Sequence, residues 1–372
     1  MSETDNLFRI KVIGVGGGGS NAVNRMIDRR IDGVDFAVVN TDIQALNASM
    51  APEKVQIGER LTRGLGAGSD PAIGKLAAEE STLKLAEMLG GYNMLFLVAG
   101  FGGGTGTGAT PVIAKIARDM NIMTIAVVTK PFNFEGATRF KKAKEGVKSL
   151  RESVNTVIVI PNDRLLEFTS QETSIADAFN MIDDILGNAI ESVSRLLARK
   201  GLINLDFADV RSILSEKGGT LLGYGDSEGG NKEVCAIEAA LKSPLLERKG
   251  IIGARGILIN FTGGKDLSLH QINSAVGLVS ELVHKEANII FGASIDEGMT
   301  GRALVTIIAT GLDLAYDVEL YEEKEKLEGE KEPKQTMINF TTNERGIFSK
   351  LDSSPFNGVD LDIPTFLRRK KN

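Results

Sequence analysis

The stretch MLFLVAGFGGGTGTGATPVIAKIARD, residues 94–119, decides the fold. Its apolar run from Met94 to Ala99 predicts a buried strand, the glycines of 102–108 predict a loop, and Thr110 to Asp119 predicts a helix that begins at Thr110-Pro111. The same order occurs earlier in the chain, where the apolar run Phe8 to Val15 is followed by Gly16 to Gly19 and a helical pattern from Asn21 to Arg30. The sequence therefore predicts strand, glycine loop and helix twice.

Short apolar runs and amphipathic stretches continue to alternate through the first half of the chain. We expect strands over Val34–Asn40, Met123–Thr129 and Thr156–Ile160, and a helix over Asp70–Leu89. This alternation predicts an α/β fold with a doubly wound, mostly parallel sheet, in which ligands bind at the carboxyl ends of the strands. Both glycine loops follow predicted strands and so belong to that edge.

A long helix and a second α/β unit follow. Ser174 and Asp177 form a capping-box pattern, Gly201 marks a stop, and an apolar stripe lies between them: Ile175, Phe179, Ile182, Leu186, Ile190, Val193 and Leu197. This stripe, at helical period, predicts a rod of about 36 Å. We then expect strands over Arg255–Phe261, Asn288–Ser294 and Leu304–Thr310, with a helix over Leu269–Glu286.

Composition limits the classes of function. The hydrophobic share of 42% and charged share of 25% indicate globular domains. Cys235 is the one cysteine, which excludes an intramolecular disulfide and favours the cytoplasm. The net charge of -6 argues against nucleic-acid binding, and no apolar run approaches the roughly 18 to 20 residues that span a bilayer.

The glycine loops indicate phosphate binding. Gly14, Gly16 and Gly19 have the G-x-G-x-x-G spacing, which lets backbone amides and a helix N-terminus face a phosphate. This motif alone also suits an unliganded turn, or a dinucleotide oxidoreductase with Asp42 as the ribose-binding acid. The second loop, at 102–108, favours a nucleoside phosphate, and no Gly-Lys-[Ser/Thr] completes a Walker pattern.

The glycine-rich loop at 102–108 resembles the signature loop of the tubulin family, and the chain is most similar to the FtsZ branch, the bacterial cell-division homologues of tubulin. The similarity runs over residues 8–316, includes VTKPFNFEG at 128–136 and NLDFADV at 204–210, and resumes at Asp362–Arg368. It implies a cytoplasmic GTPase that forms head-to-tail filaments and organises the division ring at midcell beneath the membrane. It also implies GTP or GDP as ligand, with Mg²⁺ held through phosphates and water.

The resemblance assigns the nucleotide site residue by residue. It implies that phosphates contact Gly17, Gly18, Gly19, Ser20, Asn21, Gly104, Thr105, Gly106, Thr107 and Gly108, and that Ala67, Gly68 and Ser69 sense the terminal phosphate. Glu135 and Arg139 would contact the ribose and phosphate side, and Asn162 the sugar. Phe179 would stack on the base and Asp183 would select guanine; on helix periodicity alone, core packing and a solvated face explain these two residues.

Asp206 and Asp209 follow the long helix, far along the chain from the glycine loops. On their own they suit a helix cap. In the family this loop enters the nucleotide pocket of the next subunit, where the two aspartates orient or polarise the attacking water and Asn204 supports the γ-phosphate. Hydrolysis would then depend on assembly.

The resemblance and the composition together predict five segments. They are a GTP-binding domain over 1–172, a connecting helix over 173–200, a C-terminal α/β domain over 201–318, a charged linker over 319–360 and a docking peptide over 361–372. The docking peptide would bind membrane-tethering adaptors and division regulators through Ile363, Phe366 and Leu367. A filament protein for plasmid partition or cell shape, or one that hydrolyses GTP poorly, remains an alternative. Thr110 departs from the alanine expected after the signature loop.

Overall fold

The computed structural model describes residues 8–31, 33–167, 172–197, 207–243, 246 and 250–312. Its first sheet has six parallel strands in the order β3-β2-β1-β4-β5-β6. These strands are β1 (Ile10–Val15), β2 (Asp35–Asn40), β3 (Glu53–Gln56), β4 (Met94–Gly100), β5 (Met123–Lys130) and β6 (Thr156–Pro161). The prediction of a doubly wound parallel sheet is confirmed, and the strand order changes direction between β1 and β4, where such sheets bind ligands.

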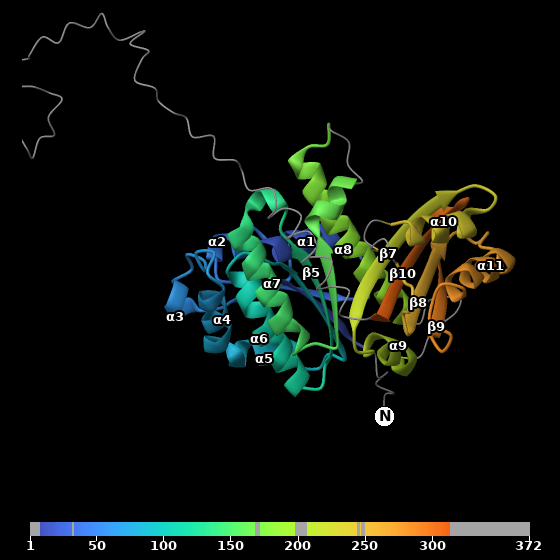
Figure 1. Ribbon diagram of the computed structural model, residues 1–372. Helices are drawn as coiled ribbons and strands as arrows, with labels where there is room; N and C mark the ends of the chain where they lie inside the picture. Colours follow the sequence, from blue (N-terminus) through green and yellow to red (C-terminus); the bar gives the residue numbers. More distant parts are fainter. Residues whose placement is uncertain are drawn as a thin grey trace, which may run out of the picture. The chain divides into compact units, whose positions relative to one another are not determined.

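Helices cover both faces of this sheet (Figure 1). The helices of this part of the chain are α1 (Gly16–Asp28), α2 (Ile43–Ala48), α3 (Glu59–Thr62), α4 (Pro71–Glu80), α5 (Thr82–Leu89), α6 (Thr105–Asp119), α7 (Ala137–Arg151) and α8 (Ile175–Leu197). Neighbouring residues of β1 face opposite sides: Ile13 packs in a core with α4 to α7, whereas Val12 packs in a core with α1 and α8. Burial on both faces explains why these strands are continuous apolar runs.

Both glycine-rich stretches extend into helix starts: Gly16 to Gly19 form the first turn of α1, and α6 begins at Thr105 after a loop that contains Gly102 to Gly104. We expected helices from Asn21 and from Thr110, but α1 begins at Gly16 and α6 begins at Thr105, so that Pro111 lies inside the helix. The amide of Gly108 already donates to the Gly104 carbonyl at 3.0 Å. Glycine weakens a helix interior but permits the first turn, where packing against neighbouring backbone decides the conformation.

Two predicted helices differ in length from those observed. The helix expected over Asp70–Leu89 is two helices, α4 and α5, which are separated at Ser81. The Ser81 hydroxyl accepts a hydrogen bond from the Gly58 amide at 3.1 Å, a tertiary contact that the sequence pattern does not reveal. The helix expected over Leu269–Glu286 ends at Ser280.

The second sheet has the order β7-β10-β8-β9. Its elements are α9 (Phe207–Leu214), β7 (Gly219–Glu228), α10 (Lys232–Leu241), β8 (Gly256–Gly263), α11 (Leu269–Ser280), β9 (Asn288–Ile295) and β10 (Arg302–Leu312). Strand β7 was not predicted because its glycines interrupt the apolar pattern. Two of them are needed for packing, since a Cβ at Gly223 would lie 2.8 Å from the Ala240 carbonyl oxygen, and one at Gly225 would lie 2.0 Å from that of Ala236.

Helix α8 follows the first sheet, and its buried residues contact both parts of the described structure. Ser174 caps it by accepting from the Asp177 amide at 3.1 Å, as the sequence predicts. Leu186 and Ile190 lie in one core cluster with Val12 of the first sheet and Ile308 of the second. Gly201, the expected stop, lies outside the described residues. Within the described residues, none of the helices has the length and apolar content to cross a membrane.

Candidate nucleotide-binding site

Two helix N-termini converge at the carboxyl edge of the first sheet. Helix α1 directly follows β1, and α6 begins five residues after β4, which pairs with β1 in parallel. A Cβ on Gly16 would lie 2.9 Å from the Gly106 amide nitrogen, so the two starts are in contact. The N-termini of two helices therefore meet where the strand order reverses, and both dipoles favour an anion there.

Neither N-terminus is satisfied by a cap. The residues that precede the two helices, Val15 and Gly104, make no side-chain cap hydrogen bond, and neither first turn contains an acid. The first amides of a helix have no acceptor within the helix. Phosphate oxygens would supply the missing acceptors. The two uncapped helix N-termini are therefore the reason that a nucleoside phosphate fits the site.

The glycines at this edge have two separate roles. Gly14, Gly19 and Gly108 permit close packing, because a Cβ there would lie 2.3 Å from the Gly19 carbonyl oxygen, 2.2 Å from that of Val98 and 2.0 Å from that of Pro71, respectively. At Gly17 and Gly103, in contrast, an added Cβ would meet no described atom within 4 Å. Gly17 and Gly103 therefore face open space in which a ligand can approach the backbone.

The predicted phosphate contacts differ in accessibility. Gly17, Gly18 and Asn21 are exposed and Thr105 is half-buried, whereas the others are buried: Gly19, Ser20, Gly104, Gly106, Thr107 and Gly108. The Ser20 hydroxyl donates to the Gly16 carbonyl at 2.8 Å. The Thr107 hydroxyl accepts from the Gly102 amide at 2.9 Å, so it shapes the loop.

The loop of Ala67, Gly68 and Ser69 lies beside the start of α6. Ala67 is buried, and its Cβ would be 2.8 Å from a Cβ on Gly104. Ser69 has a positive φ of 60°, which is uncommon for a residue with a side chain. Lys142 of α7 donates to the Ser69 carbonyl at 2.6 Å, which places a cation at this loop that the sequence analysis did not identify.

The residues predicted for the sugar and base lie near the ends of β5 and β6. Glu135 accepts from the Phe132 amide at 2.9 Å and pairs with Arg139. Asn162 directly follows β6 and is buried, and its Oδ1 has no hydrogen-bond partner among the described atoms. An orphaned buried acceptor is costly, and a ligand hydroxyl would satisfy it.

The aromatic and acidic residues on α8 face the same region. Phe179 is 44% exposed despite its place in the apolar stripe, and its ring meets that of Phe132 edge to face at 5.7 Å. Asp183 lies one turn further along α8. Burial raises the pKa of Asp183 to about 7, an effect that Arg25 opposes and Asp184 reinforces.

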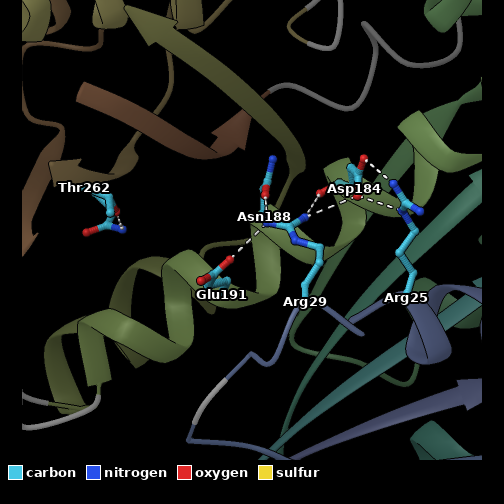
Figure 2. Close-up of polar contacts among 7 residues, drawn as sticks. Arg25, Arg29, Asp184, Asn188, Glu191 and Thr262 are labelled. Carbon is cyan, nitrogen blue, oxygen red and sulfur yellow. Dashed lines mark hydrogen bonds and ion pairs between the residues drawn. The ribbon is translucent and has the colours of Figure 1, made fainter. Parts of the chain in front are cut away.

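Polar contacts join helix α1 to α8 at Asp184, the residue after Asp183 (Figure 2). Arg25 donates to both carboxylate oxygens of Asp184, at 2.9 and 3.1 Å. Arg29 donates to the Asp184 carbonyl at 3.1 Å and to the Asn188 side chain at 2.5 Å. The helix whose first turn faces the phosphates is therefore fixed to the helix that carries Phe179 and Asp183.

Two further residues from the sequence analysis have structural roles. The Asp42 carboxylate accepts from the amides of Gln44 and Ala45 and so caps α2, a structural role that accounts for this acid without a ribose. The Thr110 hydroxyl is buried and donates to the Gly106 carbonyl at 2.6 Å, which accommodates the departure from alanine inside α6.

The acid loop is described only from Phe207 onward, so Asn204 and Asp206 lie outside the described residues, as does the predicted docking peptide at 361–372. Asp209 is exposed in the first turn of α9. The Phe207 ring lies 4.4 Å from that of Phe8, which precedes β1. Helix α9 therefore begins at the amino end of β1, whereas the glycine stretches follow the carboxyl ends of β1 and β4.

This fold and site define a nucleoside-phosphate-binding protein of the parallel α/β class. A model of the Tubulin/FtsZ family GTPase domain matches residues 9–170, and a model of the FtsZ family C-terminal domain matches residues 218–313. An empty FtsZ dimer from M. jannaschii is 40% identical, with a TM-score of 0.78 over 82% of this chain and 88% of that chain.

Two other solved structures share the fold at lower identity. CetZ2 from Haloferax volcanii, a GTPγS-bound protofilament, is 22% identical with a TM-score of 0.71 over 87% of this chain and 99% of that chain. CetZ1 from the same organism, a GDP-bound monomer, is 20% identical with a TM-score of 0.72 over the same shares. The chain belongs to the Tubulin/FtsZ family. It is a GTPase, and GTP and GDP are the ligands of its first domain.

Proposed function

We propose that this chain assembles head to tail into cytoplasmic filaments and hydrolyses GTP at the contact between neighbouring subunits. The observation that carries the proposal is the position of Asp209. Its helix contacts Phe8 at the amino end of β1, and the Thr156 hydroxyl at the start of β6 donates to the Leu214 carbonyl. A six-residue strand is about 20 Å long, so this acid and its own phosphate loops lie at opposite edges of the sheet.

Stacking of one subunit on the next would bring these acidic groups to a phosphate site that its own subunit leaves without them. If the amino edge of one subunit rests on the carboxyl edge of the next, Asp209 of one copy enters the phosphate site of the other. By the resemblance, Asp206 acts with Asp209 on the attacking water, and Asn204 supports the γ-phosphate. Phosphoryl transfer depends on positioning and charge, so groups supplied by a neighbour can change the rate by orders of magnitude.

Within one subunit, we propose that the chain holds the nucleotide as the resemblance implies. The free amides of the first turns of α1 and α6 bind phosphate oxygens, with Ala67, Gly68 and Ser69 at the terminal phosphate. Asn162 binds the sugar, Phe179 stacks on the base, and Asp183 accepts from the two guanine donors. Adenine has an acceptor at the ring position, and that mismatch costs about 1 to 3 kcal/mol per unpaired buried group. Mg²⁺ would be held by phosphates and water.

The head-to-tail contact explains the polymer, and the comparison with known structures supports its cellular role. A head-to-tail interface is heterologous and does not close, so it generates filaments. The FtsZ structure is a dimer and the CetZ2 structure is a protofilament, which supports assembly of this chain. Identity of 40% to FtsZ against 20 and 22% to the two CetZ chains favours a role in the division ring at midcell over plasmid partition or cell shape.

The C-terminal residues complete the proposal. We propose that 361–372 is a peptide that docks membrane-tethering adaptors and division regulators, with Ile363, Phe366 and Leu367 as its apolar anchors. The preceding 319–360 would act as a flexible linker. A linker of about 40 residues has an r.m.s. reach of roughly 35 Å, which lets a filament lie near a membrane without inserting into it.

The test is GTP turnover against protein concentration, with light scattering, for the parent, Asp209→Ala and Asp119→Ala. Asp119 is an exposed acid at the end of α6 and controls for loss of a surface charge. We expect specific activity to rise steeply above a threshold concentration in the parent and the control. Asp209→Ala should bind GTP and scatter light but hydrolyse little. Specific activity that is constant down to the lowest dilution would contradict activation by a neighbour.

A further inference from the structure

Two threonine hydroxyls meet across the carboxyl end of β1. Thr41 follows β2, and Thr105 is the first residue of α6, which follows β4; the two strands flank β1 in the sheet. Their Oγ1 atoms lie 2.7 Å apart. Gly16 lies beside this contact, because a Cβ there would be 3.4 Å from the Thr105 Cβ, and its φ of 72° suits glycine. The sheet order thus brings together two hydroxyls that are far apart in sequence.

Burial fixes the direction of this hydrogen bond. Thr41 is fully buried, whereas Thr105 is half-buried at the candidate phosphate site. Across the described part of the chain, Thr105 is the one partner found for the Thr41 hydroxyl. If Thr105 donated, the Thr41 proton would be buried without an acceptor, which is energetically unfavourable. Thr41 therefore donates, and the proton of Thr105 stays free for another acceptor.

The backbone of Thr41 is held in place from both sides. Its amide donates to Asn40 Oδ1 at 2.9 Å. Its carbonyl accepts from the Gly66 amide at 3.4 Å, next to the Ala67–Ser69 loop, and lies 3.3 Å from the Thr62 hydroxyl, which is 3.0 Å from the Gly58 carbonyl. Because its backbone is fixed, the Thr41 hydroxyl can orient the Thr105 hydroxyl at little entropic cost. The hydrogen bond that Thr41 donates also polarises the O–H bond of Thr105.

We propose that Thr41 is a positioning residue for nucleotide binding, which aims the Thr105 hydroxyl proton at a phosphate oxygen without touching the nucleotide itself. This inference rests on the proposed function, in which Thr105 contacts phosphate. It predicts that Thr41 acts on affinity through Thr105 alone. A residue that acted by general packing would affect affinity independently of Thr105.

The test is a double-mutant cycle with fluorescent GDP on the full chain: parent, Thr41→Val, Thr105→Val and the double variant. We expect Thr41→Val to weaken GDP binding about fivefold, the change that one hydrogen bond between neutral groups is typically worth. The double variant should bind GDP as weakly as Thr105→Val and no more weakly, because the two changes remove one coupled contact. Thr41→Ser, which keeps the hydroxyl, should restore parental affinity.

Thr310→Val is the matched control, since Thr310 of β10 is fully buried and its hydroxyl donates to the carbonyl of Ile213 in α9 at 2.9 Å. It should lower the melting temperature as Thr41→Val does but leave the GDP dissociation constant unchanged. Parental affinity in Thr41→Val, or additive losses in the double variant, would overturn the inference. Failure of the parent chain to bind GDP would instead overturn the proposed function.

Discussion

Arg25 of α1 and Asp184 of α8 form a two-pronged ion pair, with Nε and Nη2 of the guanidinium 2.9 and 3.1 Å from the two carboxylate oxygens. Each side chain is 38% exposed. The pair joins the helix that begins at the phosphate site to the helix that carries Phe179 and Asp183. Arg25 is also a cation near Asp183 and lowers the pKa of that carboxyl against the effect of burial, whereas Asp184 raises it.

Arg25→Gln should lower the free energy of unfolding only modestly. Half-exposed pairs are screened by water and salt, and Arg29 stays 3.6 Å from the Asp184 carboxylate, so we expect a loss of about 0.5 to 1 kcal/mol that shrinks at high salt. Urea unfolding at low and high salt measures it. Arg30→Gln, at an exposed position two residues after the end of α1, is the control and should change little. A loss that did not depend on salt would argue against the ion pair as its cause.

Nucleotide affinity should depend on pH through Asp183. Its pKa is about 7 in the nucleotide-free chain, above the usual 3.8. The donors of guanine favour the ionised carboxylate, so below pH 7 binding must release a proton, and affinity should fall by up to about tenfold per pH unit. GDP titrations between pH 5.5 and 8.5 measure the slope. Asp183→Asn should bind more weakly at pH 8 and show only the dependence that comes from the phosphates.

The raised pKa of Asp183 also makes the stability of the folded chain depend on pH, in a direction that can be predicted. Because the folded-state pKa is higher than the unfolded one, the folded state holds more protons between pH 4 and 7. The contribution of Asp183 to stability therefore falls as pH rises through that window and is constant above it. Unfolding measurements on the nucleotide-free parent should show this fall between pH 4 and 7, and Asp183→Asn should not show it. A gain of stability with rising pH that disappeared in Asp183→Asn would refute the assignment.

Alanine at two neighbouring glycines should separate folding from binding. At Gly14 an added Cβ would lie 2.3 Å from the Gly19 carbonyl oxygen, so Gly14→Ala should destabilise the fold by about 1 to 3 kcal/mol or prevent folding. At Gly17 an added Cβ would meet no described atom within 4 Å beyond the adjacent backbone, and alanine favours a helix over glycine by about 1 kcal/mol. Gly17→Ala should therefore keep or raise the melting temperature.

Nucleotide binding by Gly17→Ala should weaken even though its fold does not. In Gly17→Ala the new methyl group points into the space proposed for phosphate, so the GDP dissociation constant should rise while the melting temperature does not fall. Calorimetry and a GDP titration on the same preparation check both quantities. Parental affinity in a well-folded Gly17→Ala would argue that the first turn of α1 does not contact the nucleotide.

Much of the first domain could be predicted from the sequence. Parallel strands buried on both faces are continuous apolar runs, so β1, β4 and β5 were recognisable, and glycine stretches after strands indicated a phosphate site at their carboxyl ends. Strand β7 could not be predicted, because Gly223 and Gly225 are required by α10, which was also missed. The break at Ser81 depends in the same way on a distant partner, Gly58.

The sequence by itself determined the class of fold, the two glycine-rich stretches that follow strands and the residue types that suit a nucleoside phosphate, because strand periodicity and backbone freedom are local properties. Only the tertiary structure decided that Thr41 meets Thr105, that Arg25 binds Asp184 and that Asp209 lies at the far edge from the glycine stretches. These relationships depend on strand order and helix packing. They join residues whose separation along the chain carries no local signal.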